Sequence, residues 1–262
     1  MRWCDERIPS IGLTRQTRLV RGAGTRWTPL ALTNLFAWFS AKQKVYSDAG
    51  TTPAVNDDPV RRWVSMNDVG IYVDQSTLGN RPVYVTDDGA PYVYFDGSND
   101  FMASNVVASD IDATTGLTVW VSLWAGVLAA DTSVISAWTG TASRMFNLGW
   151  DTGPKATWEI DDGDGLSKTS IRPGGIVLPD LATWNTMAGT FDNASNGMKL
   201  LLKNAELATG SYTNTPTGDE PFTFGRLLSG ADRWFNGYLR DVVIVERQLT
   251  SDELLLLEGY AA

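Results

Sequence analysis

The segment that reads WEIDDGDG, residues 158–165, carries the carboxylates with the clearest chemical potential. Alternate residues of a strand point to the same face, so Glu159 and Asp161 could lie side by side. A retaining glycosidase uses two carboxyl groups about 5 to 5.5 Å apart as nucleophile and acid. The run DDGDG is also typical of a tight turn. We therefore expect a hairpin between strands over Ala156–Ile160 and Ser167–Ile171, and we assign no catalytic residue.

Two clusters of side-chain oxygens are candidates for metal binding, because Ca²⁺ prefers oxygen ligands. The candidate residues are Asp161, Asp162 and Asp164 in one cluster and Asp96, Asn99 and Asp100 in another. Neither cluster has the ligand spacing and the bidentate glutamate of an EF-hand loop. Turns favour the same residue types. Calcium is therefore kept as an alternative without an assigned ligand set, and no other cofactor is expected.

Two residue types that carry much enzyme chemistry are scarce. The 262 residues include no histidine, which is the most frequent general base and the commonest metal ligand. Cys4 is the only cysteine, so an internal disulfide and a thiolate zinc site are both excluded. The composition therefore favours a protein that binds or builds over an enzyme.

Charge is distributed unevenly along the chain. The net charge is −9, so we expect no nucleic acid partner. Residues 1–33 contain six arginines against Asp5 and Glu6, a balance of +4, which leaves −13 for the remainder. Such an asymmetry is typical of an arm that docks on an oppositely charged surface, and a solvated leader has the same composition.

Residues 1–33 are predicted to form an extended arm, because they lack helical or alternating periodicity and contain several glycines and prolines. Apolar and cationic side chains are spaced along the arm as anchors for a neighbouring protein. The candidate partner-binding residues are Trp3, Ile8, Ile11, Arg15, Arg18, Arg21, Arg26 and Trp27. We expect the arm to hold the chain in an oligomeric assembly.

Residues 34–262 are predicted to form one all-β domain. Short runs rich in β-branched and aromatic residues alternate with clusters of Gly, Asn, Asp and Pro, as in a β-sandwich. In Leu117–Trp124 every second residue from Leu117 onward is aliphatic, which predicts one apolar face. Further strands are expected over 83–85, 92–95, 133–138, 145–150, 156–160, 186–191, 198–203, 222–224 and 238–246.

One helix is expected, over Leu249–Tyr260. Thr250 and Glu253 form a capping box, and Gly259 is expected to end the helix after about two turns. No apolar run reaches the roughly 18 residues of a membrane span. The first residues lack the apolar stretch of a secretory signal, so no membrane partner is expected.

Seven segments of the chain carry motifs that match a known pattern: 81–84, 94–101, 117–124, 183–192, 198–210, 222–226 and 235–254. Among these motifs are RPVY, YFDGSNDF and LTVWVSLW. Together the segments resemble the laminin-G-like branch of the concanavalin A-like lectin/glucanase superfamily, from about Asn34 to Tyr260. RPVY and YFDGSNDF resemble a strand and turn of the family, and LTVWVSLW resembles its next long strand. Where the family carries two histidines in a following strand, this chain has Asn185 and Thr186.

This resemblance implies a concanavalin A-like jelly-roll sandwich with an N-terminal arm and a short C-terminal helix. WEIDDGDG resembles the start of an acidic strand motif in laminarinase-type glycosidases, but the second glutamate of that motif is absent here. Sheets in the superfamily also present aromatic platforms to sugars. The chain has 11 tryptophans, among them Trp120, Trp124, Trp138, Trp150 and Trp158 in expected strands and Trp234 in an expected loop. None is assigned to a sugar site.

The residues upstream of the first matching segment, 81–84, add a second resemblance. YSDAGTTPAVNDDPV at 46–60, followed by RWV at 62–64, is similar to a lead-in found in modules that bacteriophages encode. It implies a non-catalytic structural component of a phage virion, located in the virion and anchored by its arm to capsid or tail subunits as a capsid decoration, cement or tail-associated protein. The alternative is a carbohydrate-binding adhesin module that recognises a host surface glycan.

Overall fold

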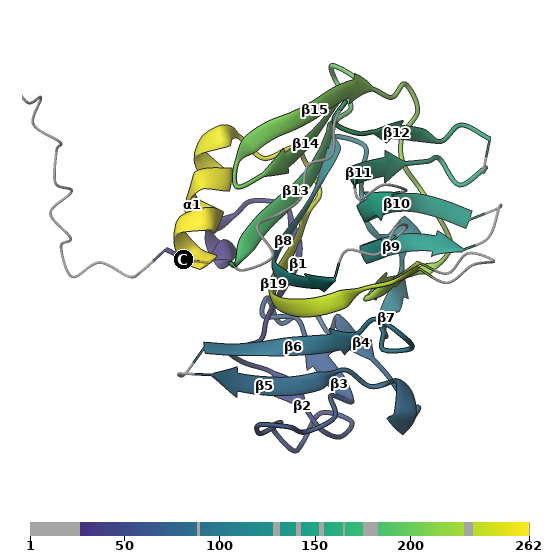
Figure 1. Ribbon diagram of the computed structural model, residues 1–262. Coiled ribbons are helices and arrows are strands. Elements are labelled where there is room, and N and C mark those ends of the chain that lie inside the picture. Colours follow the sequence, from purple (N-terminus) through teal and green to yellow (C-terminus); the bar gives the residue numbers. More distant parts are fainter. Residues whose placement is uncertain are drawn as a thin grey trace, which may run out of the picture.

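Two antiparallel β-sheets packed face to face make up most of the protein (Figure 1). The computed structural model describes residues 27–87, 90–127, 132–139, 143–151, 155–164, 166–174, 183–227 and 233–261. The β-sandwich with a C-terminal helix that the sequence predicts is confirmed. Within the described ranges, every helix is too short or too polar to cross a membrane.

One sheet has eight strands in the order β15-β14-β13-β8-β19-β6-β5, and β1 pairs with β19 beside this path. All its pairs are antiparallel, and β8 and β19 lie at its centre. The strands are β1 (Leu35–Ser40), β5 (Val83–Asp87), β6 (Ala90–Asp96), β8 (Gly116–Val127), β13 (Asn185–Asp192), β14 (Gly197–Leu202), β15 (Ala205–Ser211) and β19 (Asn236–Val245).

The second sheet has nine strands in the order β12-β11-β10-β9-β16-β7-β4-β3-β2. Its strands are β2 (Val45–Tyr46), β3 (Arg62–Val64), β4 (Tyr72–Asp74), β7 (Met102–Val107), β9 (Thr132–Thr139), β10 (Ser143–Asp151), β11 (Lys155–Ile160), β12 (Thr169–Ile171) and β16 (Pro221–Phe224). The remaining elements are the pair β17 (Arg226–Leu227) and β18 (Arg233–Trp234), and the short 3-10 helices η1 (Pro29–Ala31), η2 (Leu78–Asn80) and η3 (Ala108–Asp110).

The core between the sheets follows from strand alternation. In β8 the aliphatic residues from Leu117 to Leu123 are fully buried and face the second sheet, as predicted. Large aromatic residues such as Trp158 in β11 and Phe191 in β13 fill the same layer. Burying so many large side chains is the main favourable contribution to folding.

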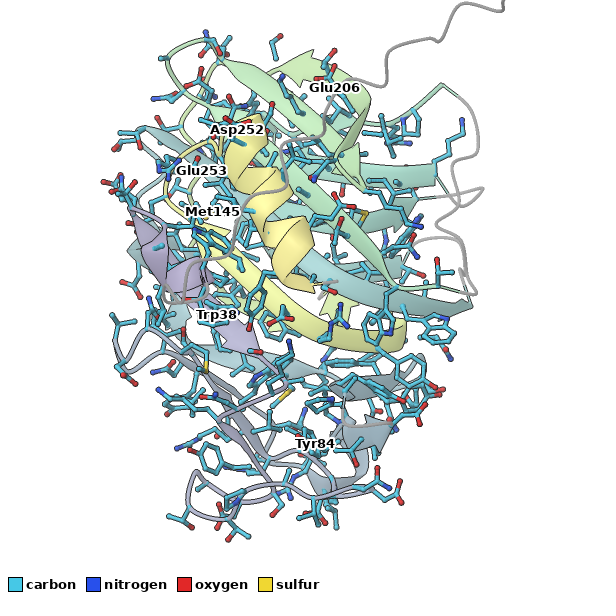
Figure 2. The ribbon with its side chains drawn as sticks, turned by 90° about the vertical axis from the view of Figure 1, so that its left-hand side faces the viewer. Trp38, Tyr84, Met145, Glu206, Asp252 and Glu253 are labelled. Atoms are coloured by element: carbon cyan, nitrogen blue, oxygen red, sulfur yellow. The ribbon has the colours of Figure 1, made fainter. Side chains whose placement is uncertain are left out.

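The C-terminal helix α1 (Ser251–Ala261) lies on the outer face of the eight-stranded sheet (Figures 1 and 2). Leu254 and Leu257 face the sheet and pack in a cluster with Trp120 of β8, Trp38 of β1 and Val243 of β19. These outward-facing apolar residues are buried in this cluster, to which Leu32 and Leu249 outside α1 also belong. The helix thus covers part of the outer face.

The predicted capping box of α1 is confirmed. The Glu253 amide donates to Thr250 Oγ1 at 3.3 Å, and the Thr250 amide donates to Glu253 Oε2 at 2.9 Å. The prediction that Gly259 ends the helix is wrong, because the helix continues to Ala261. Tyr260 packs at 5.5 Å from the Trp38 ring and Ala261 is buried, so tertiary contacts hold the last turn.

Asp100 is a buried acid in the turn between β6 and β7. Its Oδ2 accepts a hydrogen bond from the Asp96 amide at 3.0 Å, while Asp96 Oδ1 accepts from the amides of Ser98 and Asn99. Gly97, with a φ of +76°, supplies the left-handed conformation of the turn. Burial, and then the neighbouring Asp96 carboxylate, raises the pKa of Asp100 to about 7.

This raised pKa makes stability depend on pH. The pKa of an unfolded aspartate is about 3.9, so the folded protein retains the proton of Asp100 where the unfolded chain loses it. The contribution of Asp100 to the free energy of unfolding is therefore present at about pH 4 and lost as the pH rises to about 7. Asp100→Asn should not lose this contribution, so the stability of the variant relative to the wild type should grow from pH 4 to 7 and then level off. Urea unfolding of both proteins across this range checks it, and parallel pH profiles would contradict it.

Candidate functional site

A cluster of aromatic side chains lies on the outer face of the eight-stranded sheet, beside the C-terminal end of α1. Strand register brings its members together: Tyr238 of β19 pairs with Trp124 of β8 on one side and with Tyr94 of β6 on the other. Tyr92, two residues before Tyr94, points to the same face, and Trp184 precedes β13. We call these five residues the aromatic platform.

The rings of the platform contact one another closely. The centroid of Tyr238 lies 4.9 Å from that of Tyr92, 4.9 Å from that of Tyr94 and 6.0 Å from that of Trp124. Trp184 lies 5.6 Å from Tyr92 and 6.2 Å from Trp124. All five side chains are half-buried, so each ring is held by its neighbours and still reaches solvent.

Two tyrosines of the platform, Tyr92 and Tyr94, have raised pKa values and keep their phenolic protons at neutral pH. Burial, together with the nearby Asp87 and Tyr238, raises the pKa of Tyr92, and burial with Tyr238 and two aspartates raises that of Tyr94. Protonated phenols donate hydrogen bonds as well as accept them. The platform therefore offers flat apolar rings edged by polar donors.

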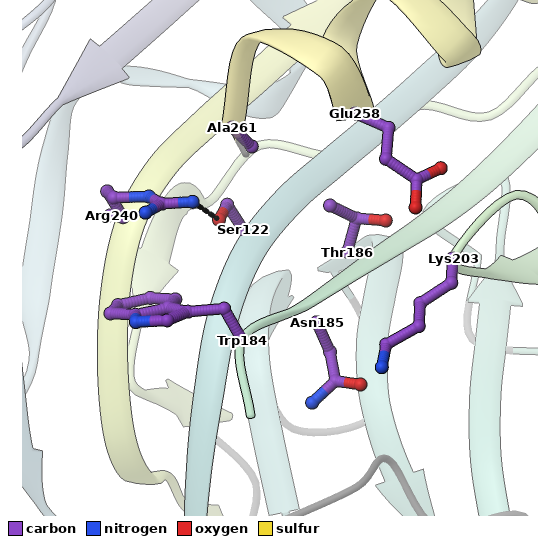
Figure 3. A pocket seen from close by; sticks show the side chains of 8 residues that line it. All are labelled: Ser122, Trp184, Asn185, Thr186, Lys203, Arg240, Glu258 and Ala261. Carbon is purple, nitrogen blue, oxygen red and sulfur yellow. Dashed lines mark hydrogen bonds between the residues drawn. The ribbon is translucent and has the colours of Figure 1, made fainter. Parts of the chain in front are cut away.

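A pocket of about 110 Å³ adjoins the platform and shares Trp184 with it (Figure 3). Its floor comes from the neighbouring strands β8 and β13, and its walls come from β19, the β14–β15 turn and the end of α1. The lining residues are Ser122, Trp184, Asn185, Thr186, Lys203, Arg240, Glu258 and Ala261. We call this the α1 pocket.

Stacking and hydrogen bonding place Arg240 between the platform and the α1 pocket. Its guanidinium lies 4.6 Å from the centroid of the Trp184 ring, and its Nη2 donates to Ser122 Oγ at 3.5 Å. Burial lowers the pKa of the guanidinium, which nevertheless stays charged at neutral pH. The site thus combines aromatic faces, hydroxyl and amide groups and a cation.

The acidic segment considered for glycosidase chemistry is structural. β11 and β12 form the expected antiparallel hairpin. Glu159 is buried in β11, where it accepts hydrogen bonds from Asn147 Nδ2 at 2.9 Å and Ser170 Oγ at 2.7 Å and pairs with Lys168 at 3.3 Å. Asp161 is fully buried directly after the strand. These contacts involve both carboxyl oxygens of the buried Glu159.

The oxygen clusters considered for calcium serve turns. Ligand atoms of Asp161, Asp162 and Asp164 lie within 4.8 Å of one another. Asp164 Oδ1 accepts from the amides of Leu166 and Ser167 at 2.6 and 2.8 Å, which keeps the pKa of Asp164 low. Asp96 Oδ1 accepts hydrogen bonds from three backbone amides of its own turn. We assign no calcium ligand set.

Most candidate residues of the N-terminal arm lie outside the described residues; these are Trp3, Ile8, Ile11, Arg15, Arg18, Arg21 and Arg26. Trp27 is described, and it packs partly buried against the cluster that includes Trp38 and Leu257. The segment from Trp27 to Leu32 therefore contacts the helix side of the sandwich. Partner binding by the arm stays a prediction.

Sequence reasoning missed the platform. Trp184 lies on the outer face beside Trp124. The other strand tryptophans are buried, whereas Trp234 is half-buried and packs against Arg226 and Phe101. The only signal in the sequence was the aromatic content itself, since ring proximity depends on pairing between β6, β8 and β19.

Comparison with known families and structures agrees with this architecture. A family model described as the concanavalin A-like lectin/glucanases superfamily matches residues 96–255. No curated protein matches the chain significantly.

One similar solved structure is domain 4 of AbnA, a GH43 extracellular arabinanase from Geobacillus stearothermophilus, in complex with arabinotriose. It is 15% identical to this chain with a TM-score of 0.57, and the match covers 87% of this chain and 98% of that one. The botulinum neurotoxin serotype G binding domain is 12% identical with a TM-score of 0.60, covering 87% of this chain, which spans about half of that domain (51%). A Ruminococcus gnavus IT-sialidase CBM40 is 17% identical with a TM-score of 0.51, covering 64% and 96%. At such identities the likeness establishes the fold alone.

Proposed function

The chain belongs to the concanavalin A-like lectin/glucanases superfamily, and on that premise we propose that it is a non-catalytic carbohydrate-binding module. Its binding site is the aromatic platform together with the α1 pocket. The single observation that carries the proposal is the set of five mutually supported rings that reach solvent beside a polar pocket.

This combination suits the chemistry of sugars. A pyranose ring has a C–H face that packs on an aromatic ring and a rim of hydroxyl groups that need donors and acceptors. Trp184 and Trp124 offer the faces, while Tyr238, Ser122 and Asn185 offer polar groups. Ligand pockets generally combine apolar walls with a few polar groups that fix orientation. At about 110 Å³ the α1 pocket is small, so a glycan would lie mainly along the platform.

Two solved modules with the same fold support the choice of ligand class. The AbnA domain was solved with arabinotriose, and the R. gnavus module is a CBM40 that was also solved with sialyllactose. The absence of histidine and the structural contacts of Glu159 support a module without catalysis. The fold, the site and the composition thus favour the same function.

An array of neutral and acidic oligosaccharides tests this proposal. The chain should bind a discrete set of glycans, and Tyr238→Ala should lose that set while keeping the thermal unfolding midpoint close to that of the wild type. Tyr238 is suited to this test because its ring contacts Tyr92, Tyr94 and Trp124. Silence across the array, or an unchanged set with the variant, would contradict the proposal.

We further propose that a bacteriophage virion carries this module, as a capsid decoration or tail-associated protein anchored to capsid or tail subunits through its N-terminal arm. The resemblance of residues 46–64 to phage-encoded modules and the charge of +4 on residues 1–33 support this second proposal. Deletion of residues 1–26 leaves the contacts of Trp27 in place and is expected to abolish incorporation into particles. Wild-type copy number of the truncated chain in purified particles would contradict it.

A further inference from the structure

Two cations stand out at the α1 pocket of a chain whose net charge is −9. Lys203 and Arg240 line the pocket, and Glu258 is its only carboxylate lining residue within the described chain. Glu258 Oε2 already accepts a hydrogen bond from Asn204 Nδ2. The lining is therefore positive on balance.

Contacts with Trp184 and Ser122 hold the Arg240 side chain in place and leave its Nε donor without a hydrogen bond among the described residues. Its side chain is only 11% exposed, because it stacks on Trp184 and lies against the sheet. Within the described part of the chain its Nε has no hydrogen-bond partner, and the nearest carboxylate oxygen, Asp241 Oδ2, lies 3.9 Å away. Burial raises the pKa of Asp241, which weakens that carboxylate as a counter-ion. A cation this buried is costly unless another anion completes its pairing.

The floor of the pocket also carries an unused polar group. Ser122 of β8 and Thr186 of β13 are register partners and both line the pocket. Thr186 is 7% exposed, and its buried Oγ1 has no hydrogen-bond partner among the described residues. Buried hydroxyls are normally paired, so this atom is suited to bind a ligand.

The arrangement of these groups separates the charges. Figure 3 shows Arg240 above Trp184 and next to Ser122 on one side of the pocket, with Glu258 and Lys203 on the other. A planar guanidinium matches a carboxylate with two parallel hydrogen bonds, and Trp184 would support the adjoining sugar ring. An anion beside Arg240 would be kept apart from Glu258.

We propose that the ligand of this site is an acidic glycan, in which the carboxylate of a sugar residue pairs with Arg240 while its ring packs on Trp184. Thr186 and Ser122 bind the same residue at the pocket floor, and Lys203 adds positive charge. This inference rests on the proposed function and names its substrate class.

Titration calorimetry with matched probes tests the inference. The probes are 3′-sialyllactose, a galacturonate trimer and a hyaluronan tetrasaccharide, each compared with its carboxyl-reduced neutral form, together with a sulfated galactose oligosaccharide. At least one carboxylated probe should bind at least about 10-fold more tightly than its reduced form. Arg240→Gln should remove this preference, and Arg240→Lys should restore part of it.

Two exposed lysines supply variants that leave folding intact. Lys203→Gln should weaken binding of the acidic probe several-fold. Lys199→Gln removes the same charge from β14 and should have no effect. Lys199 is not a lining residue of the α1 pocket, and its Nζ lies 3.2 Å from Glu206 Oε2. Equal binding of acidic and reduced forms, or preference for the sulfated probe, would overturn the inference while the carbohydrate-binding function stands. Failure of every carboxylated probe to bind would also overturn the inference, whereas the proposed function itself is contradicted when no glycan of the array binds.

Discussion

Replacing Trp184 with alanine is expected to weaken glycan binding by roughly 30-fold, which corresponds to about 2 kcal/mol. Trp184 belongs both to the aromatic platform and to the α1 pocket, and it supports Arg240 from below. Removing its ring takes away a stacking face and loosens the guanidinium at the same time. Calorimetric titration with a glycan selected on the array measures the loss.

The fold should tolerate this change. Trp184 precedes β13 and is half-buried on the outer face, outside the core between the sheets. Trp234→Ala is the matched control, because Trp234 is also half-buried and also stacks on an arginine, Arg226, at 4.8 Å. We expect the control to bind as the wild type does. Equal losses in the two variants would argue against the platform as the binding site.

The largest effect on stability is expected for Gly189→Ala in the middle of β13. A Cβ atom at Gly189 would lie 2.2 Å from Cδ2 of Trp158, whose side chain is fully buried between the sheets. The ring has to move, and neighbours in a core of this density leave it little room. Overpacking of this kind costs about 1 to 3 kcal/mol, and we expect the upper end here. The free energy of unfolding in urea measures the effect.

Gly259→Ala is the control for that substitution. Gly259 lies inside α1, and nothing lies within 4 Å of the position its Cβ would occupy. Alanine is favoured over glycine in a helix by up to about 1 kcal/mol, so this variant should be as stable as the wild type or more so. A free energy of unfolding for Gly189→Ala within about 0.5 kcal/mol of the wild-type value would contradict the close packing of Trp158 on β13.

The long elements were predictable from local sequence. β8 extends over 12 residues with regular alternation, and Thr250 with Glu253 marks the start of α1 through contacts within one turn. By contrast β2, β3 and β4 have two or three residues each, too few for a periodic signal. Gly259 was misinterpreted because contacts of Tyr260 and Ala261 with distant strands outweigh the local preference.

The candidate site depended on information that local patterns lack. Tyr92 and Tyr94 belong to β6, Trp124 to β8 and Tyr238 to β19, and pairing between strands far apart in sequence brings their rings together. Alternation predicts that Trp120 and Trp124 share a face, yet α1 covers Trp120 and leaves Trp124 half-exposed. The position of one helix therefore decides which part of this face meets solvent.

A crystal structure of the chain with a glycan selected on the array tests the central claim most directly. We expect a sugar ring packed on Trp184 on the outer face of the eight-stranded sheet, with its polar groups reaching Ser122, Thr186 and Arg240. A glycan bound elsewhere, for example against Trp234 and Phe101, with the platform uncovered, would contradict the account.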